Sequence, residues 1–162
     1  MVEKERKFKV TSKKFISLSH KVINIKQGYL SKEKNISVRI RISENKSFLC
    51  IKGPSSKSGI SRFEFEKEIS LIEGSELLKL CLPRIISKKR YLIEYKKQLF
   101  EIDVFEGFLK GLMLAEIELN SETQKVYLPD WIGEEVTGLK TFYNSQLSIL
   151  TDNEIRALIS KY

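Results

Sequence analysis

The chain has few of the residues that build zinc sites, disulfide frameworks or histidine-based catalytic centres. Its 162 residues include two cysteines and one histidine. Cys50 and Cys81 are far apart and lack C-x-x-C spacing, so neither a zinc motif nor a disulfide framework is predicted. Neither cysteine has an identifiable histidine partner, since nothing near His20 supports a catalytic role. Cys50 is therefore read as a small buried residue and not as a nucleophile.

Long apolar runs and targeting segments are also missing. No run approaches the roughly 20 apolar residues that a membrane-spanning helix needs. The N-terminus is charged where a signal peptide would be apolar. We find no repeat, no low-complexity segment and no linker, and 41% of the residues are apolar. We therefore expect one globular domain over 1–162, located in the cytoplasm, with no membrane partner.

Positive charge is in excess. Lysine and arginine total 29 against 21 aspartates and glutamates, which gives a net charge of +8. An excess of this size favours an anionic partner, which could be a nucleic acid, a phosphate compound or an acidic membrane surface.

Alternation of apolar and polar residues predicts mostly strands. Eight segments show it: 2–10, 23–31, 36–43, 47–52, 61–70, 90–96, 98–105 and 113–120. Short turns join most of them, and the polar stretch 53–59 is typical of a surface loop. The pattern favours an antiparallel sheet closed into a barrel.

Helical patterns are fewer. Ser12 could cap a short helix that reaches about residue 19, and apolar residues recur at helical spacing in 73–81 and 138–149. Thr151 and Glu154 form a capping box that predicts a last helix, with Ile155, Leu158 and Ile159 on one face.

The first strand carries charges at alternate positions. Glu3, Glu5 and Lys7 point to the same side of an extended strand. Two carboxylates beside an ammonium suit a site that holds a divalent cation and meets an anion. Charged alternation is also common on solvated strands, so the spacing has little weight by itself.

Several later strands place like charges two residues apart. The pairs are Arg39 with Arg41, Lys88 with Arg90, and Glu116 with Glu118. Like charges on one face repel unless a counter-ion lies between them. The basic pairs therefore favour a polyanion, and the acidic pairs favour a cation.

Periodicity alone leaves the orientation of the faces open. An ordinary barrel would bury the apolar face and expose the charges, and periodicity by itself favours that arrangement. A polar interior would require helices or a second subunit to cover the apolar outer face. The like-charge pairs favour the polar interior.

An ordered set of motifs resembles the triphosphate tunnel metalloenzymes, or CYTH superfamily, over nearly the whole chain. The E-x-E-x-K signature matches Glu3, Glu5 and Lys7. The other matching segments are 27–31 (QGYLS), 38–41 (VRIR), 51–53 (IKG), 61–62 with Glu64, 88–91 (KKRY), 103–107 (DVFEG), 115–118 (AEIE) and 131–137 (WIGEEVT). The resemblance implies the α+β class: an eight-stranded antiparallel β-barrel tunnel with flanking helices and a C-terminal helix.

The resemblance also implies an activity and a cofactor. It implies metal-dependent hydrolysis of a triphosphate, with Mg2+ or Mn2+ held by carboxylates. Inorganic tripolyphosphate, cleaved to pyrophosphate and phosphate, is the leading substrate. A nucleoside or thiamine triphosphatase and a class IV-type adenylate cyclase are alternatives with a related site.

Site residues follow from the matched positions. The phosphate ligands expected from the resemblance are Arg39, Arg41, Lys52, Arg62, Lys88 and Arg90. The expected metal ligands are Glu3, Glu5, Glu64, Asp103, Glu116 and Glu118, which offer the hard oxygens that Mg2+ and Mn2+ prefer. Glu64 and Asp103 could instead be ion-pair partners of the arginines. Lys7 and Tyr29 resemble a catalytic lysine–tyrosine pair.

A binding module is the alternative outside enzymes. Basic groups without metal chemistry would suffice to bind polyphosphate or RNA, but a pure anion binder gains nothing from inward carboxylates. The aromatic residues mostly alternate onto the apolar face, so no nucleic-acid partner is expected. The expected partner is a small-molecule triphosphate, and a homodimer is possible because the apolar outer face needs cover.

Overall fold

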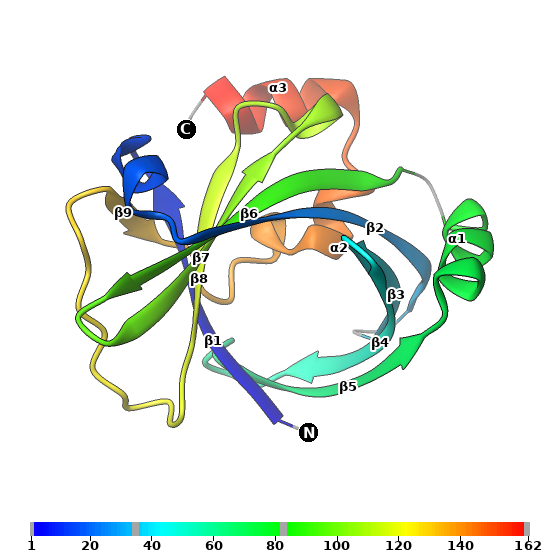
Figure 1. The fold of residues 1–162 in the computed structure, drawn as a ribbon, viewed down its shortest axis with the longest axis horizontal. Coiled ribbons are helices and arrows are strands. Elements are labelled where there is room, and N and C mark those ends of the chain that lie inside the picture. Colours follow the sequence, from blue (N-terminus) through cyan, green and yellow to red (C-terminus); the bar gives the residue numbers. More distant parts are fainter. Residues whose placement is uncertain (1, 34–35, 82–83, 161–162) are drawn as a thin grey trace.

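Nine strands form one antiparallel sheet in the computed structural model, which describes residues 2–33, 36–81 and 84–160 (Figure 1). The strands are β1 Val2–Val10, β2 Lys21–Glu33, β3 Ile36–Ser43, β4 Lys46–Ser55, β5 Ser61–Ile69, β6 Ile86–Tyr95, β7 Gln98–Phe105, β8 Met113–Glu118 and β9 Ile132–Glu135.

Eight of these strands close into a barrel. Their order is β5-β4-β3-β2-β6-β7-β8-β1, and β1 returns to pair with β5. The first residues of β1 pair with β5, and the segment from Glu5 to Lys9 pairs with β8 on the other side. The last residues of β1 pair with β9. The expected eight-stranded antiparallel barrel is confirmed, and β9 is an additional strand that the alternation did not predict.

The charged faces of the strands point into the barrel. Lys7, Arg39, Lys52, Lys88 and Asp103 are all buried. By contrast, two phenylalanines of β5, Phe63 and Phe65, are 44% and 39% exposed on the outside. The interior is therefore polar, and the arrangement that periodicity alone favoured, with apolar residues inside, is wrong.

The larger hydrophobic core lies against the outer face of the barrel. It comprises Phe8, Val10, Phe15, Ile93, Phe100, Ile102, Ala115, Ile117, Leu119 and Trp131. Phe15 comes from η1 Lys14–Leu18, and its ring packs edge-on to Tyr91 and against Trp131. Burial of each large side chain contributes about 1.5–3 kcal/mol, so this outer layer supplies much of the stability.

A second core closes one end of the barrel. Ile86, Phe105 and Leu114 continue the inward faces of β6, β7 and β8 beyond their charged residues. They pack with residues from the C-terminal part of the chain, namely Val136, Phe142, Leu147 and Ile155. The inner surface is thus charged over most of its length and apolar at this end.

The helices differ in part from those that the sequence predicts. α1 Leu71–Lys79 is capped by Ser70, which forms a capping box with Glu73. α3 Asp152–Ser160 follows the capping box of Thr151 and Glu154, which is confirmed.

Two helix predictions fail. Ser12 is not a cap, because the residue before η1 is Lys13 and no side chain caps that helix. The helix expected over 138–149 is two short pieces, η3 Lys140–Phe142 and α2 Asn144–Leu147. Tyr143 has an extended backbone between them and breaks the helix. A further 3-10 turn, η2 Gly107–Leu109, precedes β8.

Strand boundaries also shift. The strand expected over 90–96 begins at Ile86, so Lys88 and Arg90 lie on the same strand. The loop expected over 53–59 is shorter, because β4 extends to Ser55. No helix among the described ranges has the length and apolar character to cross a membrane.

Candidate functional site

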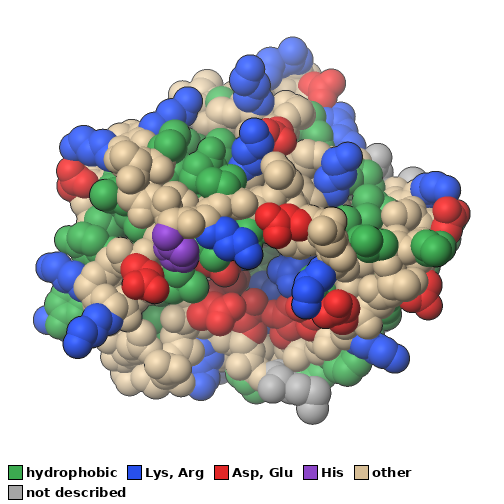
Figure 2. Space-filling model, in the orientation of Figure 1, with side chains coloured by type: hydrophobic (Ala, Val, Ile, Leu, Met, Phe, Trp, Pro, Cys, Tyr) green, Lys and Arg blue, Asp and Glu red, His purple; other side chains and the backbone are tan. Residues whose placement is uncertain are grey.

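A cavity of about 470 Å³ opens into the barrel. Side chains from all eight barrel strands line it, most of them charged. Figure 2 shows the corresponding hollow, where acidic and basic side chains gather side by side. Because an antiparallel barrel turns every second residue inward, the charges that alternate along the sequence converge here.

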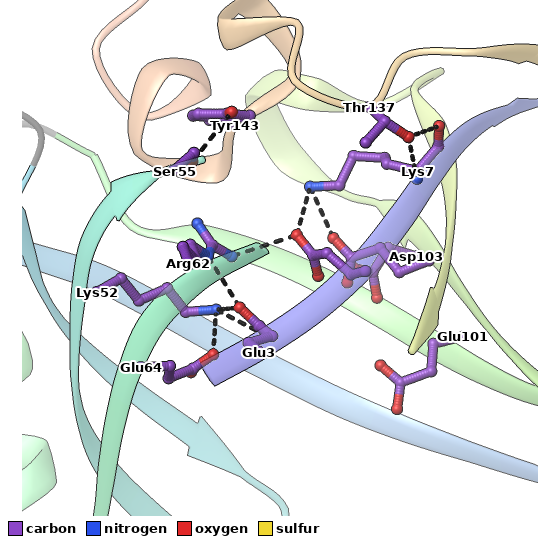
Figure 3. A network of polar contacts seen from close by, with 12 residues as sticks. Glu3, Lys7, Lys52, Ser55, Arg62, Glu64, Glu101, Asp103, Thr137 and Tyr143 are labelled. Atoms are coloured by element: carbon purple, nitrogen blue, oxygen red, sulfur yellow. Dashed lines mark hydrogen bonds and ion pairs between the residues drawn. The ribbon is translucent and has the colours of Figure 1, made fainter. Parts of the chain in front are cut away.

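One group of contacts joins β1, β4 and β5 (Figure 3). Lys52 donates hydrogen bonds to Glu3, with Nζ 2.9 Å from Oε2, and its Nζ lies 2.8 Å from Oε2 of Glu64. Arg62 donates from Nε to the same oxygen of Glu3 at 2.8 Å and from Nη2 to Glu5 at 3.2 Å. Two cations and three carboxylates therefore hold one another in place at this wall.

A second group is centred on Glu116 of β8. Lys7 Nζ lies 2.8 Å from Oε1 of Glu116, and Arg90 donates to Oε2 at 2.7 Å. Burial opposes the charged form of Glu116, but Lys7 and Arg90 outweigh it and hold its pKa well below the usual value. Burial likewise opposes the charge of Lys7, and Glu116 and Glu5 raise its pKa above the usual value. Both groups are ionised at neutral pH.

Asp103 of β7 holds two cations of β6. Arg90 donates to both of its carboxylate oxygens at 2.7 Å, and Lys88 donates to Oδ2 at 2.5 Å. Asp103 is 1% exposed. Burial opposes its ionisation, but Arg90 and Lys88 lower its pKa below the usual value. Both oxygens are engaged, which favours the ion-pair role over the metal-ligand role for Asp103.

Lys88 has an unusual proton affinity. Burial lowers its pKa to about 8, and Asp103 compensates only in part because that carboxylate is shared with Arg90. Lys88 is therefore charged below pH 8 and loses its charge above it.

The carboxylates that could hold a metal ion lie on adjacent strands. Glu5 of β1 is directly opposite Glu118 of β8, and Glu101 of β7 is directly opposite Glu116. Burial raises the pKa of Glu101. Directly opposed carboxylates destabilise a sheet unless a cation joins them. Their oxygens therefore fit Mg2+ or Mn2+, and Glu118 is the one of these four glutamates that pairs with no cation among the described residues.

A different donor set also lies close together. Within the described part of the chain, Cys50, Glu64 and Glu66 have potential ligand atoms within 4.8 Å of one another. The Cys50 thiol donates to Glu66 at 2.8 Å and accepts from Arg39 at 3.2 Å. Arg41 donates to both oxygens of Glu66, at 2.9 and 2.8 Å. This wall is occupied by arginines, so its carboxylates chiefly orient Arg39 and Arg41.

Tyr29 lies deeper in the barrel. It is 6% exposed, and burial raises its pKa to about 12, so the phenol is protonated at neutral pH. Tyr29, Lys7 and Arg39 line one small cavity of about 20 Å³. The structure therefore brings the predicted Lys7–Tyr29 pair together beside Arg39, one of the predicted phosphate ligands.

The segment around α2 closes this deeper end. The small cavity beside Lys7 and Tyr29 is also lined by Tyr143, Asn144 and Ser145. The Tyr143 hydroxyl hydrogen-bonds to Ser55 of β4 at 3.3 Å (Figure 3). Tyr143 also lines another cavity, of about 520 Å³. This cavity shares Lys52 and Arg62 with the main cavity of about 470 Å³.

The structure brings the predicted site residues to one barrel interior, and it adds four that the sequence reasoning left out. The lining of the main cavity includes every predicted phosphate ligand and the glutamates Glu3, Glu5, Glu64, Glu116 and Glu118. The additions are Gln27, Cys50, Glu66 and Glu101. All four have the inward parity of their strands, which was the signal available in the sequence.

The comparisons with known proteins agree over most of the chain. The family model described as the CYTH domain matches residues 1–150. A curated relative from Acetivibrio thermocellus, named inorganic triphosphatase, is 42% identical over 146 residues, which is 90% of this chain and 92% of the relative. A relative of the same name from Nitrosomonas europaea is 37% identical over 153 residues, which is 92% of this chain and 98% of the relative.

Solved structures show the same fold. A crystal structure of an inorganic triphosphatase is 32% identical and superposes with a TM-score of 0.65, covering 92% of this chain and 95% of that one. A protein from Pyrococcus furiosus, 22% identical, has a TM-score of 0.60 and covers 75% of this chain and 80% of its own. The latter similarity concerns the fold alone.

Proposed function

The chain belongs to the CYTH domain family, and we propose from this premise that it is a metal-dependent hydrolase of inorganic triphosphate. The relatives from Acetivibrio thermocellus and Nitrosomonas europaea are named for that activity, and they align over nearly their whole length. The reaction adds water to a terminal phosphorus of tripolyphosphate and releases phosphate and pyrophosphate.

The observation that carries the proposal is the mixture of charges around one tunnel. The cations are Lys7, Arg39, Arg41, Lys52, Arg62, Lys88 and Arg90, and the carboxylates are Glu3, Glu5, Glu64, Glu66, Glu101, Asp103, Glu116 and Glu118. A bare polyanion would meet these eight carboxylates together with the seven cations. A triphosphate that enters with divalent cations satisfies both sets, which argues against a simple anion-binding module.

Each wall has a separate role in this proposal. Arg39, Arg41 and Arg62 present guanidinium groups that bind phosphate oxygens through two hydrogen bonds each. Lys52 and Lys88 add point charges that their carboxylate partners hold in place. Glu66 and Glu64 hold Arg41 and Arg39 in advance, and Asp103 holds Arg90, so less order is lost when the substrate binds.

Glu5 and Glu118, assisted by Glu3 and Glu116, are the residues that would hold Mg2+ or Mn2+. When bound, the ion supplies charge neutralisation and lowers the pKa of coordinated water. Lys7 remains charged and Tyr29 remains protonated at neutral pH, so both can donate hydrogen bonds to the reacting phosphoryl group. Phosphoryl transfer depends mostly on such positioning and charge stabilisation.

The test is phosphate release from tripolyphosphate, ATP and thiamine triphosphate with Mg2+, Mn2+ or EDTA. We expect metal-dependent cleavage of tripolyphosphate and slow turnover of the other two. Faster turnover of ATP or thiamine triphosphate would reassign the substrate, and cyclic AMP with pyrophosphate would indicate a cyclase. Tight binding of triphosphate without turnover would indicate a binding module instead of an enzyme.

The homodimer, the cytoplasmic location and the absence of a nucleic-acid partner stay predictions.

A further inference from the structure

Gln27 is a buried amide on the tunnel wall between the two arginine-bearing sides. It lies on β2, two residues before Tyr29, opposite Arg41 of β3 and Ile86 of β6. Its side chain is 0% exposed, yet it lines the main cavity. A polar group in this position is costly to bury unless its donors and acceptors are used.

Only half of the amide is engaged. Nε2 donates to the Tyr29 hydroxyl at 3.2 Å. Oε1 has no hydrogen-bond partner among the described residues, although it is buried. A buried carbonyl oxygen without a donor is rare in folded proteins and points to a ligand that brings one.

The chemistry of the cavity narrows the choice of that ligand. The oxygens of a fully ionised triphosphate are hydrogen-bond acceptors and cannot donate to Oε1. A metal ion is disfavoured at this point, because Arg41 is the direct neighbour and Lys88 lines the same cavity. A water molecule can donate one hydrogen to Oε1 and keep a lone pair for a phosphorus atom, provided that a small side-chain shift admits it, since Oε1 is closed to solvent in this arrangement.

The Tyr29 contact fixes the amide for this task. Because Tyr29 accepts a hydrogen bond from Nε2, its own proton remains available for a substrate oxygen. The same contact prevents rotation of the amide and directs Oε1 away from Tyr29. Gln27 and Tyr29 thus form one unit, in which one group meets the phosphate and the other presents an acceptor for water.

We propose that Gln27 positions the attacking water during triphosphate hydrolysis, an inference that rests on the proposed function. Glutamine side chains orient attacking water in other phosphoryl-transfer sites, so the chemistry is suitable. The role requires that loss of Oε1 reduces kcat while the affinity for substrate, which the cations supply, is preserved.

The experiment measures kcat and KM for tripolyphosphate with Mn2+ in Gln27→Met, Gln27→Leu and Gln27→Glu. We expect Met and Leu to reduce kcat by at least about ten-fold and to change KM by less than about three-fold. Gln27→Glu retains an acceptor oxygen, so its kcat should recover most of the loss, with a higher KM from the added negative charge. Thermal melting tests whether each variant is folded. Gln27→Met and Gln27→Leu both remove Oε1 but differ in shape, so a similar kcat in the two variants assigns the loss to the missing oxygen.

Two controls separate the water role from structural effects. Ser47→Ala removes another buried side-chain oxygen without a described partner, on β4 against Gly74 of α1 and outside the tunnel, and should leave kcat unchanged. The second control repeats Gln27→Met in a Tyr29→Phe background. The kcat loss should be smaller there, because Tyr29 also fixes the amide, but it should not disappear, because the water contact itself does not pass through Tyr29.

The outcomes are distinct. An inactive wild type rejects the proposed function, and the role of Gln27 with it. An active wild type with unchanged kcat in Gln27→Met and Gln27→Leu overturns the role of Gln27 alone. A loss that disappears in the Tyr29→Phe background, or a Gln27→Glu variant as slow as Gln27→Met, would also overturn it.

Discussion

Arg90 and Asp103 face each other across β6 and β7, and the guanidinium donates to both carboxylate oxygens at 2.7 Å. The pair is almost completely buried, and Asp103 also accepts from Lys88. A buried carboxylate shared by two cations is a rigid support, because its removal leaves Lys88 without an ion-pair partner among the described residues and takes from Arg90 one of its three carboxylates.

Asp103→Asn should therefore destabilise the fold. We expect a loss of about 3 kcal/mol in the free energy of unfolding, measured by urea denaturation. The Mn2+ concentration that gives half-maximal activity should stay within about two-fold of wild type, because Asp103 is engaged by cations and not by metal. A large increase in that concentration without loss of stability would restore the metal-ligand role.

Glu118→Gln should have the opposite profile. Glu118 is exposed at the cavity, and no ion pair or hydrogen bond of its side chain is found within the described ranges. We expect the free energy of unfolding to change by less than about 0.5 kcal/mol and the Mn2+ requirement to rise at least about ten-fold. Glu134→Gln is the control, since Glu134 is exposed on β9 and pairs only with Lys9 among the interactions described. An unaltered Mn2+ requirement in Glu118→Gln would remove Glu118 from the metal site.

The pH dependence of kcat/KM should report Lys88. Its pKa is lowered to about 8, so the ammonium is present below that pH and disappears above it. We expect kcat/KM to fall by about ten-fold per pH unit between pH 8 and 9.5, because kcat/KM follows the free enzyme. Lys88→Arg should keep the charge over this range and remove the fall. The same fall in the arginine variant would show that another group causes it.

Gly59 and Gly138 approach each other closely where the β4–β5 turn meets the loop before η3. A Cβ added to Gly59 would lie 2.4 Å from the Cα of Gly138, and φ at Gly59 is +75°. Gly59→Ala should cost more than about 2 kcal/mol, since it combines backbone strain with a clash. Gly107→Ala is the matched control. Its φ is +58° with open space around the added atom, so only the strain of about 1 kcal/mol is expected. Equal melting temperatures for the two variants would contradict the close packing.

The sequence predicted the barrel and the faces of its strands because period-two alternation is a local property. Glu3, Glu5 and Lys7 could be assigned to one side from their spacing alone, and the structure agrees. Which side is the interior could not be read from local alternation, because it depends on where the rest of the chain packs. Phe15 and Trp131 determine which side is the interior, because they come from segments distant in sequence and cover the apolar face from outside the barrel.

Partners within the site were harder to predict. Asp103 could be a metal ligand or an ion-pair partner until the register of β6 against β7 placed it opposite Arg90. Glu66 and Glu101 had the correct parity, but their contacts with Arg41 and Arg90 depend on side-chain directions across neighbouring strands. The helix over 138–149 failed because its apolar spacing serves the core that closes the barrel, in which Phe142 and Leu147 pack from two short helices.

The placement of the hydrophobic core outside the barrel has a consequence for how such a chain can diverge. Most residues that hold the fold and most residues that line the cavity alternate along the same strands and point to opposite sides of the sheet. Exchanges of inward charges can therefore redirect the chemistry while Phe8, Phe100 and Trp131 continue to maintain the architecture. Selection on substrate and selection on folding act here on two interleaved sets of positions, and the buried group of Lys88, Arg90 and Asp103 is the part of the interior where the two sets overlap.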